Sequence, residues 1–309
     1  MSTTPMLGGL LKVCATDPKL KGLLAQVGAK NLAITGIDQA RSWAIGALAH
    51  RTRLLVVTAT GREAEDLTAE LRAMVGDKVA FFPAWETLPH ERLSPGADIV
   101  GKRARVLDHL DELSVVVTAA RGFAQPILRE VEGRAPLKLV EGEEYQFDHV
   151  VSELQFRAYK HVDMVAKRGE YATRGGIVDI FPTTLDYPVR VEFWGDEISD
   201  IRQFSVADQR TIPEIQVGHV DVYPARELPI TQEVAARAAQ LAVEFPGNPA
   251  LVELLSKVGE YIPSEGMEAL LPALSTSEMV SLPEFMPGAP PVLLLAPARI
   301  HPRVAALES

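Results

Sequence analysis

Apolar runs and segments of helical periodicity alternate through the first 120 residues of the chain. The apolar runs predict four strands, at residues 31–35, 54–58, 79–82 and 114–118. The periodic segments predict helices between them, at about residues 38–50, 62–74 and 98–110. Because the apolar runs are continuous, they are typical of a parallel sheet with helices on both faces. We therefore expect a doubly wound α/β domain.

A different pattern is densest at residues 168–204. Apolar and polar residues alternate there in short runs separated by Gly, Pro and Asp, which predicts half-buried antiparallel strands. Gly195 and Asp196 fall between two apolar runs and predict a two-residue hairpin turn. This stretch is therefore expected to form a small β-rich domain, with a helix at residues 149–159 packed on its sheet.

One strand of that domain carries a candidate protein-binding surface. Arg190, Glu192 and Trp194 are spaced by two and so share one face of the strand, while Arg174 comes just before the neighbouring strand. Arg and Trp are enriched among the residues that dominate protein interfaces. The alternative is that Trp194 is half-buried and Arg190 only solvates the sheet, and the spacing alone favours this alternative.

The rest of the chain is expected to return to the first domain. Residues 215–224 are predicted to rejoin the first sheet, and the apolar run at residues 291–296 predicts a buried last strand. Two helices are predicted between them, at residues 231–244, with Thr231 as the N-cap, and at residues 249–258. No tail signal follows the last strand, so we expect the chain to be a fragment of a longer protein.

Composition narrows the class of protein. A length of 309 residues suits roughly two domains, and a formal net charge of -10 argues against a general nucleic-acid binder. Cys14 is the only cysteine, so neither a disulfide framework nor a thiolate metal site is expected. No apolar run approaches the roughly eighteen residues that a membrane span needs, and no signal peptide is visible. A cytoplasmic location is therefore expected.

Basic residues cluster at two places in this acidic chain. Five of them stand against two acidic residues in the first cluster: Arg157, Lys160, Lys167, Arg168 and Arg174. We expect this basic patch to face an acidic protein surface. The second cluster, at residues 101–105, has several acidic neighbours and is expected to solvate a helix face.

A nucleotide site is the first catalytic feature to test in such an α/β domain. Phosphates are held there by Gly-x-x-x-x-Gly-Lys-Ser/Thr at the start of a helix. The corresponding turn contains Thr35, Gly36, Asp38, Gln39 and Arg41, and no Gly-Lys-Thr occurs in any register. Asp38 places a negative charge where phosphates need a cation, and Arg41 cannot copy the point charge of lysine. We expect this loop to be degenerate and the chain to bind no ATP.

Residues 83–95 hold the other candidate chemistry. His90 and Glu91 are adjacent and are a conceivable acid/base pair, but sequence neighbours rarely converge on one substrate atom. We expect an ordered loop that covers the sheet instead.

The motifs of the β-rich stretch closely resemble a known family. Gly169-Glu-Tyr-Ala-Thr-Arg-Gly, Gln209-Arg-Thr and the upstream Pro83-Ala-Trp-Glu-Thr-Leu-Pro are similar to segments of the transcription-repair coupling factors (Mfd), which share a domain with the excinuclease subunit UvrB. The resemblance covers nearly the whole chain. It implies a degenerate P-loop, RecA-like domain with an inserted β-rich (α+β) domain that docks onto UvrA, with contacts on Arg174, Arg190 and Trp194.

The resemblance also implies domain boundaries. The expected parts are a degenerate nucleotide-fold domain at residues 1–121, the β-rich UvrA-binding domain at 122–212, and a return segment at 213–309. The UvrB region that clamps single-stranded DNA is rich in tyrosine, and ring stacking contributes ~1–3 kcal/mol per base. No tyrosine precedes Tyr145 here, so we expect no such clamp.

Three functions are compatible with these observations. The first is a non-catalytic module that recruits UvrA. The second is an active ATP-dependent DNA enzyme like UvrB, against which the missing lysine and tyrosines argue. The third is an autoinhibitory module, since in the family this surface is masked by a C-terminal domain. The resemblance implies a parent DNA translocase that uses ATP and Mg and binds double-stranded DNA and stalled RNA polymerase through regions beyond Ser309.

Overall fold

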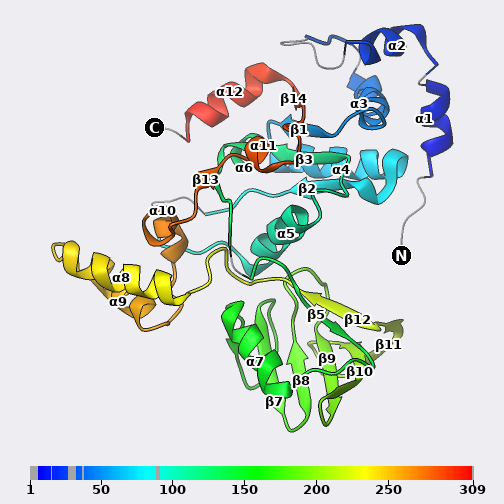
Figure 1. The fold of residues 1–309 in the computed structure, drawn as a ribbon. Helices are drawn as coiled ribbons and strands as arrows, with labels where there is room; N and C mark the ends of the chain where they lie inside the picture. Colours follow the sequence, from blue (N-terminus) through cyan, green and yellow to red (C-terminus); the bar gives the residue numbers. More distant parts are fainter. Residues whose placement is uncertain are drawn as a thin grey trace. The chain divides into compact units, whose positions relative to one another are not determined.

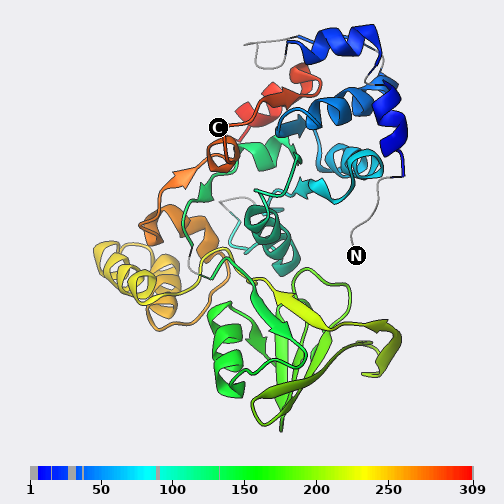
Figure 2. The same cartoon turned by 45° about the vertical axis from the view of Figure 1, so that its right-hand side comes forward.

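The computed structural model describes residues 6–14, 16–26, 33–36, 38–87, 91–131 and 133–307. The chain forms two compact units, which Figures 1 and 2 show in two views. Unit 1 contains residues 1–84, 109–129 and 279–309, and unit 2 contains residues 85–108 and 130–278. Residues 85–108 thus lie in the second unit, although they precede the boundary expected at residue 121.

A four-stranded parallel sheet forms the centre of unit 1. Its strand order is β14-β1-β3-β2, and every pairing is parallel. The strands are β14 (Val292–Leu294), β1 (Leu54–Thr58), β3 (Val115–Ala119) and β2 (Val79–Phe82). β1 and β3 are fully buried, as their continuous apolar runs predict. The last strand, β14, pairs with β1, so two segments far apart in the sequence are neighbours in one sheet. It is an edge strand and is only partly buried.

Helices and short strands complete unit 1. The helices are α1 (Gly8–Cys14), α2 (Pro18–Leu24), α3 (Arg41–Ala49), α4 (Gly61–Val75), α6 (Ala120–Ala124), α11 (Leu282–Phe285) and α12 (Pro297–Ala305). The short strands β4 (Ile127–Leu128) and β13 (Met279–Val280) pair with each other. α3 and α4 pack apolar side chains against β1 and β3. Thr60 caps α4 by accepting a hydrogen bond from the Glu63 amide, and Gly76 ends the helix at φ 79°.

The strand predicted at residues 31–35 is wrong for the part that the structure describes. Residues 33–36 belong to no strand, and residues 31 and 32 lie outside the described part. An apolar run of this length is ambiguous without the long-range pairing that would make it a strand.

A six-stranded sheet dominates unit 2, with the order β11-β10-β9-β8-β7-β6. The strands are β6 (Lys160–His161), β7 (Glu170–Arg174), β8 (Ile177–Ile180), β9 (Val189–Trp194), β10 (Glu197–Phe204) and β11 (Thr211–Gln216). All neighbours are antiparallel except β6 and β7. The turn between β9 and β10 lies at Gly195, with φ 64°, which confirms the predicted hairpin.

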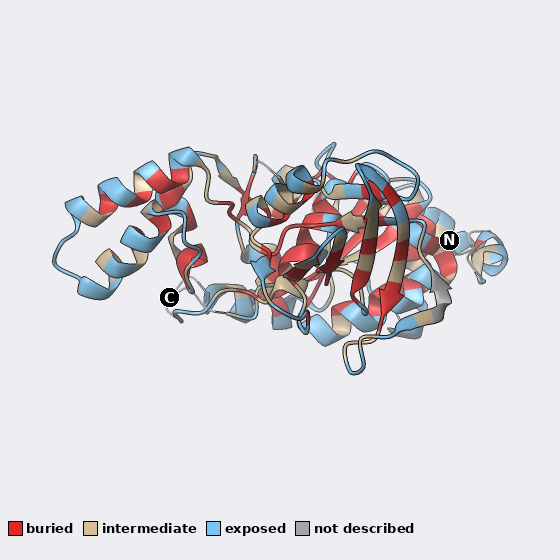
Figure 3. Cartoon of the chain, turned by 90° about the horizontal axis from the view of Figure 1, so that it is seen from below, coloured by how far each residue is buried: buried red, intermediate tan, exposed pale blue. Residues whose placement is uncertain are grey.

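One face of this sheet is apolar and covered. Val178 and Val191 on the sheet pack with Val150 and Leu154 of α7 (Phe147–Phe156), and all four are fully buried. Figure 3 shows buried and more exposed residues alternating along the strands. The predicted helix and its packing are confirmed. The opposite face carries charged and polar side chains near the turn at Gly195, and another part of it is covered by a smaller apolar cluster that contains Val165, Ala172, Phe181 and Phe204.

Residues 215–224 do not rejoin the parallel sheet, so that prediction is wrong. β11 joins the six-stranded sheet, and β12 (His219–Val222) pairs with β5 (Leu137–Val140) in a separate antiparallel pair. Val220 and Val222 of β12 enter the same apolar core as Leu139. Apolar and polar residues alternate along β12, and only one face of the strand is buried, as such alternation predicts.

Helices form the rest of unit 2. They are α5 (Ala97–Asp108), α8 (Gln232–Glu244), α9 (Pro249–Gly259) and α10 (Leu271–Leu274), with a 3-10 turn at Met267–Leu270 before the last. The predicted N-cap is confirmed, since the Thr231 hydroxyl accepts a hydrogen bond from the Val234 amide. α5 packs so closely that a Cβ on Gly101 would lie 2.0 Å from the Thr183 hydroxyl oxygen.

Candidate protein-binding face

The face of the six-stranded sheet opposite α7 gathers the predicted contact residues. We call it the charged sheet face. It is defined by Arg174, Asp179, Arg190, Glu192, Trp194, Asp200 and Arg202. Strand register places Arg174 beside Ile177 and Ile177 beside Glu192, so these residues share a row. Arg190 lies between Asp179 and Arg202 in the next row.

Trp194 is the most exposed aromatic side chain of this face. It is the last residue of β9, beside the turn at Gly195, and 82% of its surface is exposed. The alternative that Trp194 is half-buried is therefore wrong. Because the indole adds almost nothing to the core, its large apolar area is available to a partner.

Arg190 is engaged inside the unit. Its Nε and Nη2 atoms donate to the two carboxylate oxygens of Asp179 at 2.7 and 2.8 Å, and its guanidinium lies 4.9 Å from the centre of the Phe204 ring. The hydrogen bonds that Arg190 donates to Asp179 raise the pKa of the Arg190 guanidinium. The side chain of Asp179 is only 7% exposed. Arg190 therefore neutralises a buried carboxylate, which the spacing in the sequence does not reveal.

Arg202 extends this network across the sheet. Its guanidinium pairs with Glu192 and lies 3.0 Å from a carboxylate oxygen of Asp200. Two carboxylates thus share one cation. The part of the face next to the turn at Gly195 therefore has an excess of negative charge beside Trp194.

Arg174 is exposed and pairs with no carboxylate among the described residues. Its Nη2 atom donates to the Asp163 carbonyl oxygen at 3.0 Å. It lies two strands away from Glu192 in the same row, which corresponds to roughly 10 Å at the usual strand spacing. Of the three predicted contact residues, Arg174 and Trp194 are thus accessible, while Arg190 is partly buried and holds Asp179.

The basic patch is smaller than the sequence predicts. Arg157 is buried, pairs with Glu153 and donates to the Ala135 carbonyl oxygen at 3.2 Å. Arg157 follows the last residue of α7 and points inward rather than toward solvent. Lys160, Lys167 and Arg174 are exposed, and they remain candidates for contact with an acidic surface.

The second basic cluster also holds a buried residue, which corrects the solvated helix expected there. Arg103 is 1% exposed, and its Nε atom lies 2.5 Å from a carboxylate oxygen of Glu227. The Trp85 indole donates to the same oxygen at 2.9 Å. This explains the Trp85 motif structurally, since the tryptophan joins the upstream loop to α5. The sequence around Trp85 and Arg103 does not reveal this contact, because their shared partner Glu227 lies far away in the sequence.

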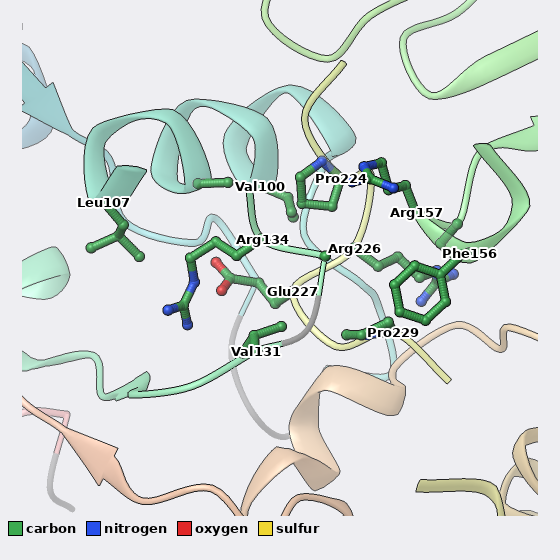
Figure 4. Close-up of a pocket in the computed structure, with 13 residues that line it drawn as sticks. Val100, Leu107, Val131, Arg134, Phe156, Arg157, Pro224, Arg226, Glu227 and Pro229 are labelled. Carbon is green, nitrogen blue, oxygen red and sulfur yellow. The ribbon is translucent and has the colours of Figure 1, made fainter. Parts of the chain in front are cut away.

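Figure 4 shows Glu227 and Arg134 beside a small cavity in this part of unit 2. The cavity holds about 10 Å³, the size of one water molecule, and Phe156 and Val131 line its apolar side. Burial lowers the pKa of Arg134. A cavity of this size is far smaller than a ligand pocket, so we treat the cluster as part of the unit's framework.

The structure describes only part of the loop that is expected to be a degenerate phosphate loop. Thr35 and Gly36 are exposed and follow no described strand, Gln39 lies in a 3-10 turn, and Arg41 is the exposed first residue of α3. Only the backbone of Asp38 is described. His90 lies outside the described residues. Within the described part, no group of three or more His, Cys, Asp or Glu side chains is placed to hold a metal ion. No helix in that part is long and apolar enough to cross a membrane.

Comparison with known proteins defines the class of the β-rich part first. Residues 137–228, which contain the charged sheet face, match the family described as the UvrB interaction domain. The chain as a whole is homologous to part of the transcription-repair-coupling factors. It is 46% identical to that of Mycobacterium tuberculosis over 99% of this chain and 26% of the relative.

More distant relatives carry the same name. The transcription-repair-coupling factor of Myxococcus xanthus is 32% identical over 78% of this chain and 22% of its own length. That of Escherichia coli is 31% identical over 58% of this chain and 16% of its own length. Nearly all of this chain matches the mycobacterial relative, but it spans only about a quarter of that protein's length.

Proposed function

We propose that this chain is a recruitment module that docks onto UvrA through the charged sheet face and so links transcription to nucleotide excision repair. The observation that carries the proposal is the exposure of Trp194, 82%, on the sheet face opposite α7, in a domain that matches the UvrB interaction domain. An exposed indole flanked by arginine and carboxylates has the composition of an interface centre with a polar rim.

We propose that the contacts are divided among the three predicted residues. Trp194 fills an apolar pocket on UvrA, Arg174 pairs with a carboxylate there, and Arg190 contributes by holding Asp179 and the strand that carries Trp194. The division follows from exposure, because Arg190 already has two hydrogen bonds to Asp179.

The proposed module is not an enzyme and holds no cofactor. The support is the sequence of the degenerate loop, which has no lysine at the phosphate position and carries Asp38 there. Calorimetry with Mg-ATP is expected to show no binding. A micromolar dissociation constant would overturn this part of the proposal.

We further propose that the module works in the cytoplasm within a longer protein, an ATP-dependent DNA translocase that displaces stalled RNA polymerase. The name of the relatives and the 26% share of the mycobacterial protein support this proposal. In such a protein, a C-terminal domain that masks the charged sheet face would combine recruitment with autoinhibition.

Charge reversal at Arg174 tests the docking face. The affinity of purified UvrA for the 309-residue chain is measured by calorimetry for the parent, for Arg174→Glu, and for Lys138→Glu as the matched control. Lys138 is also exposed, but it lies on β5, outside the charged sheet face. We expect weaker binding only for Arg174→Glu. Equal affinities for all three chains would exclude Arg174 from the interface.

A further inference from the structure

An open groove lies between the first three helices of unit 1. Its volume is about 540 Å³, within the range of ligand-binding sites in proteins. Eight residues line it: Leu11, Lys12, Lys21, Leu24, Ala25, Ala47, His50 and Arg51. They come from α1, the end of α2 and the end of α3, the helices drawn in blue in Figure 1. The groove belongs to unit 1, whereas the charged sheet face belongs to unit 2.

Close packing at one point creates the floor of the groove. Leu11 of α1 is fully buried against α3, where a Cβ on Gly46 would lie 3.3 Å from its side chain. Leu11 forms a small apolar cluster with Ala47 and Met74. Beside this contact, the partly exposed Leu24 and the exposed Ala25 present accessible apolar surface. The floor is therefore apolar and held in place by the packing of α1 on α3.

The rim of the groove is entirely basic or neutral. Lys12, Lys21, His50 and Arg51 are all exposed, and no carboxylate is among the lining residues. Within the described part of the chain, no ion pair involves any of these four side chains. The acidic residue nearest to Lys21 in sequence, Asp17, caps α2 by accepting hydrogen bonds from two backbone amides. The rim thus concentrates positive charge in a chain whose net charge is -10.

We propose that this groove binds an acidic amphipathic peptide segment of a protein partner. Apolar side chains of the segment would lie against Leu24 and Ala25, the accessible apolar residues of the lining, and its carboxylates would face Lys12, Lys21 and Arg51. Recognition of an amphipathic helix by an apolar groove with complementary rim charge is a recurring mode of peptide binding.

The lining favours a peptide over a nucleic acid. Proteins that bind single strands combine a basic groove with aromatic side chains on which bases stack. None of the eight lining residues is aromatic. The apolar floor also has no counterpart on a phosphate backbone, whereas it matches the leucine face of an amphipathic helix.

The test uses a fluorescent helical peptide of leucine, alanine and glutamate and the 309-residue chain. Fluorescence anisotropy gives the affinity for the parent, for Lys21→Glu, and for Arg51→Glu. Each variant exchanges an attraction for a repulsion, and we expect about tenfold weaker binding. Arg62→Glu is the matched control, since Arg62 is an exposed residue of α4 outside the groove, and its affinity should equal that of the parent.

Two further probes make the outcome decisive. A peptide with glutamine in place of every glutamate is expected to bind at least about tenfold more weakly. A labelled single-stranded oligonucleotide is expected to bind weakly and to respond equally to all three charge reversals. Equal binding of the two peptides would overturn the proposal. Tight oligonucleotide binding lost only in Lys21→Glu and Arg51→Glu would overturn it in favour of a nucleic-acid site.

Discussion

Replacing Arg190 with alanine is expected to lower the free energy of unfolding of unit 2, apart from any effect on UvrA binding. The substitution leaves the Asp179 carboxylate, 7% exposed, without its two hydrogen bonds at 2.7 and 2.8 Å. Breaking a fully buried ion pair costs about 3–5 kcal/mol. The Arg190 side chain is 23% exposed, so water partly replaces it, and we expect a loss of about 2–3 kcal/mol in the free energy of unfolding.

Differential scanning calorimetry measures this loss directly. For units of this size, 1 kcal/mol shifts the melting temperature by about 2–4 °C, so the expected shift is about 4–12 °C. Adding Asp179→Asn to Arg190→Ala removes the unpaired charge and should recover part of the stability. Lys160→Ala, an exposed residue of the same sheet, is the control and should melt like the parent.

If Arg190→Ala melted within about 1 °C of the parent chain, Arg190 would not stabilise the fold by neutralising Asp179. If Asp179→Asn gave no recovery in that background, the cost would not come from the buried charge. The first result would restore the simpler expectation, from the sequence, that the arginine is a surface residue whose removal leaves folding unchanged.

Three other features of unit 2 give shorter predictions. Gly101→Ala should lower the melting temperature despite the better helix propensity of alanine, because its Cβ would lie 2.0 Å from the Thr183 hydroxyl, and overpacking costs about 1–3 kcal/mol. The matched interaction domain alone should be less stable than a chain of residues 85–278, which retains α5, as thermal melting of the two would show. Burial raises the pKa of Tyr159 and of Tyr223. Ultraviolet titration should therefore find these two tyrosines still protonated above about pH 10 while the fold persists. Their stabilising effect is complete below about pH 10, where unfolded tyrosine ionises, and is lost as the pH rises further.

Local patterns are enough to predict the sheets themselves. The continuous apolar runs of β1 and β3 identify buried parallel strands, and the alternation around Gly195 identifies a hairpin, because both signals lie within a few residues. The apolar run at residues 31–35 shows the limit of this reasoning. Its described part pairs with no strand, and pairing is a property of distant segments.

The candidate site was only partly predictable for the same reason. Spacing by two places Arg190 and Trp194 on one face, and the structure confirms that placement. Spacing does not reveal that Asp179 of the neighbouring strand is buried, nor that Arg190 pairs with it. Arg103 and Arg157 are likewise expected at the surface from the sequence. Arg103 is buried against Glu227, which lies far away in sequence, and Arg157 donates to the carbonyl oxygen of Ala135 as well as pairing with nearby Glu153.

The affinity of UvrA for Trp194→Ala tests the central claim most directly. Truncation of an interface hot spot commonly costs at least ~2 kcal/mol, which corresponds to about thirtyfold weaker binding. Because Trp194 is 82% exposed, the melting temperature should stay that of the parent, and Phe245→Ala, an exposed aromatic at the end of α8, should change neither quantity. We predict thirtyfold weaker binding with unchanged melting. Unchanged affinity for Trp194→Ala would contradict the claim that the charged sheet face docks onto UvrA.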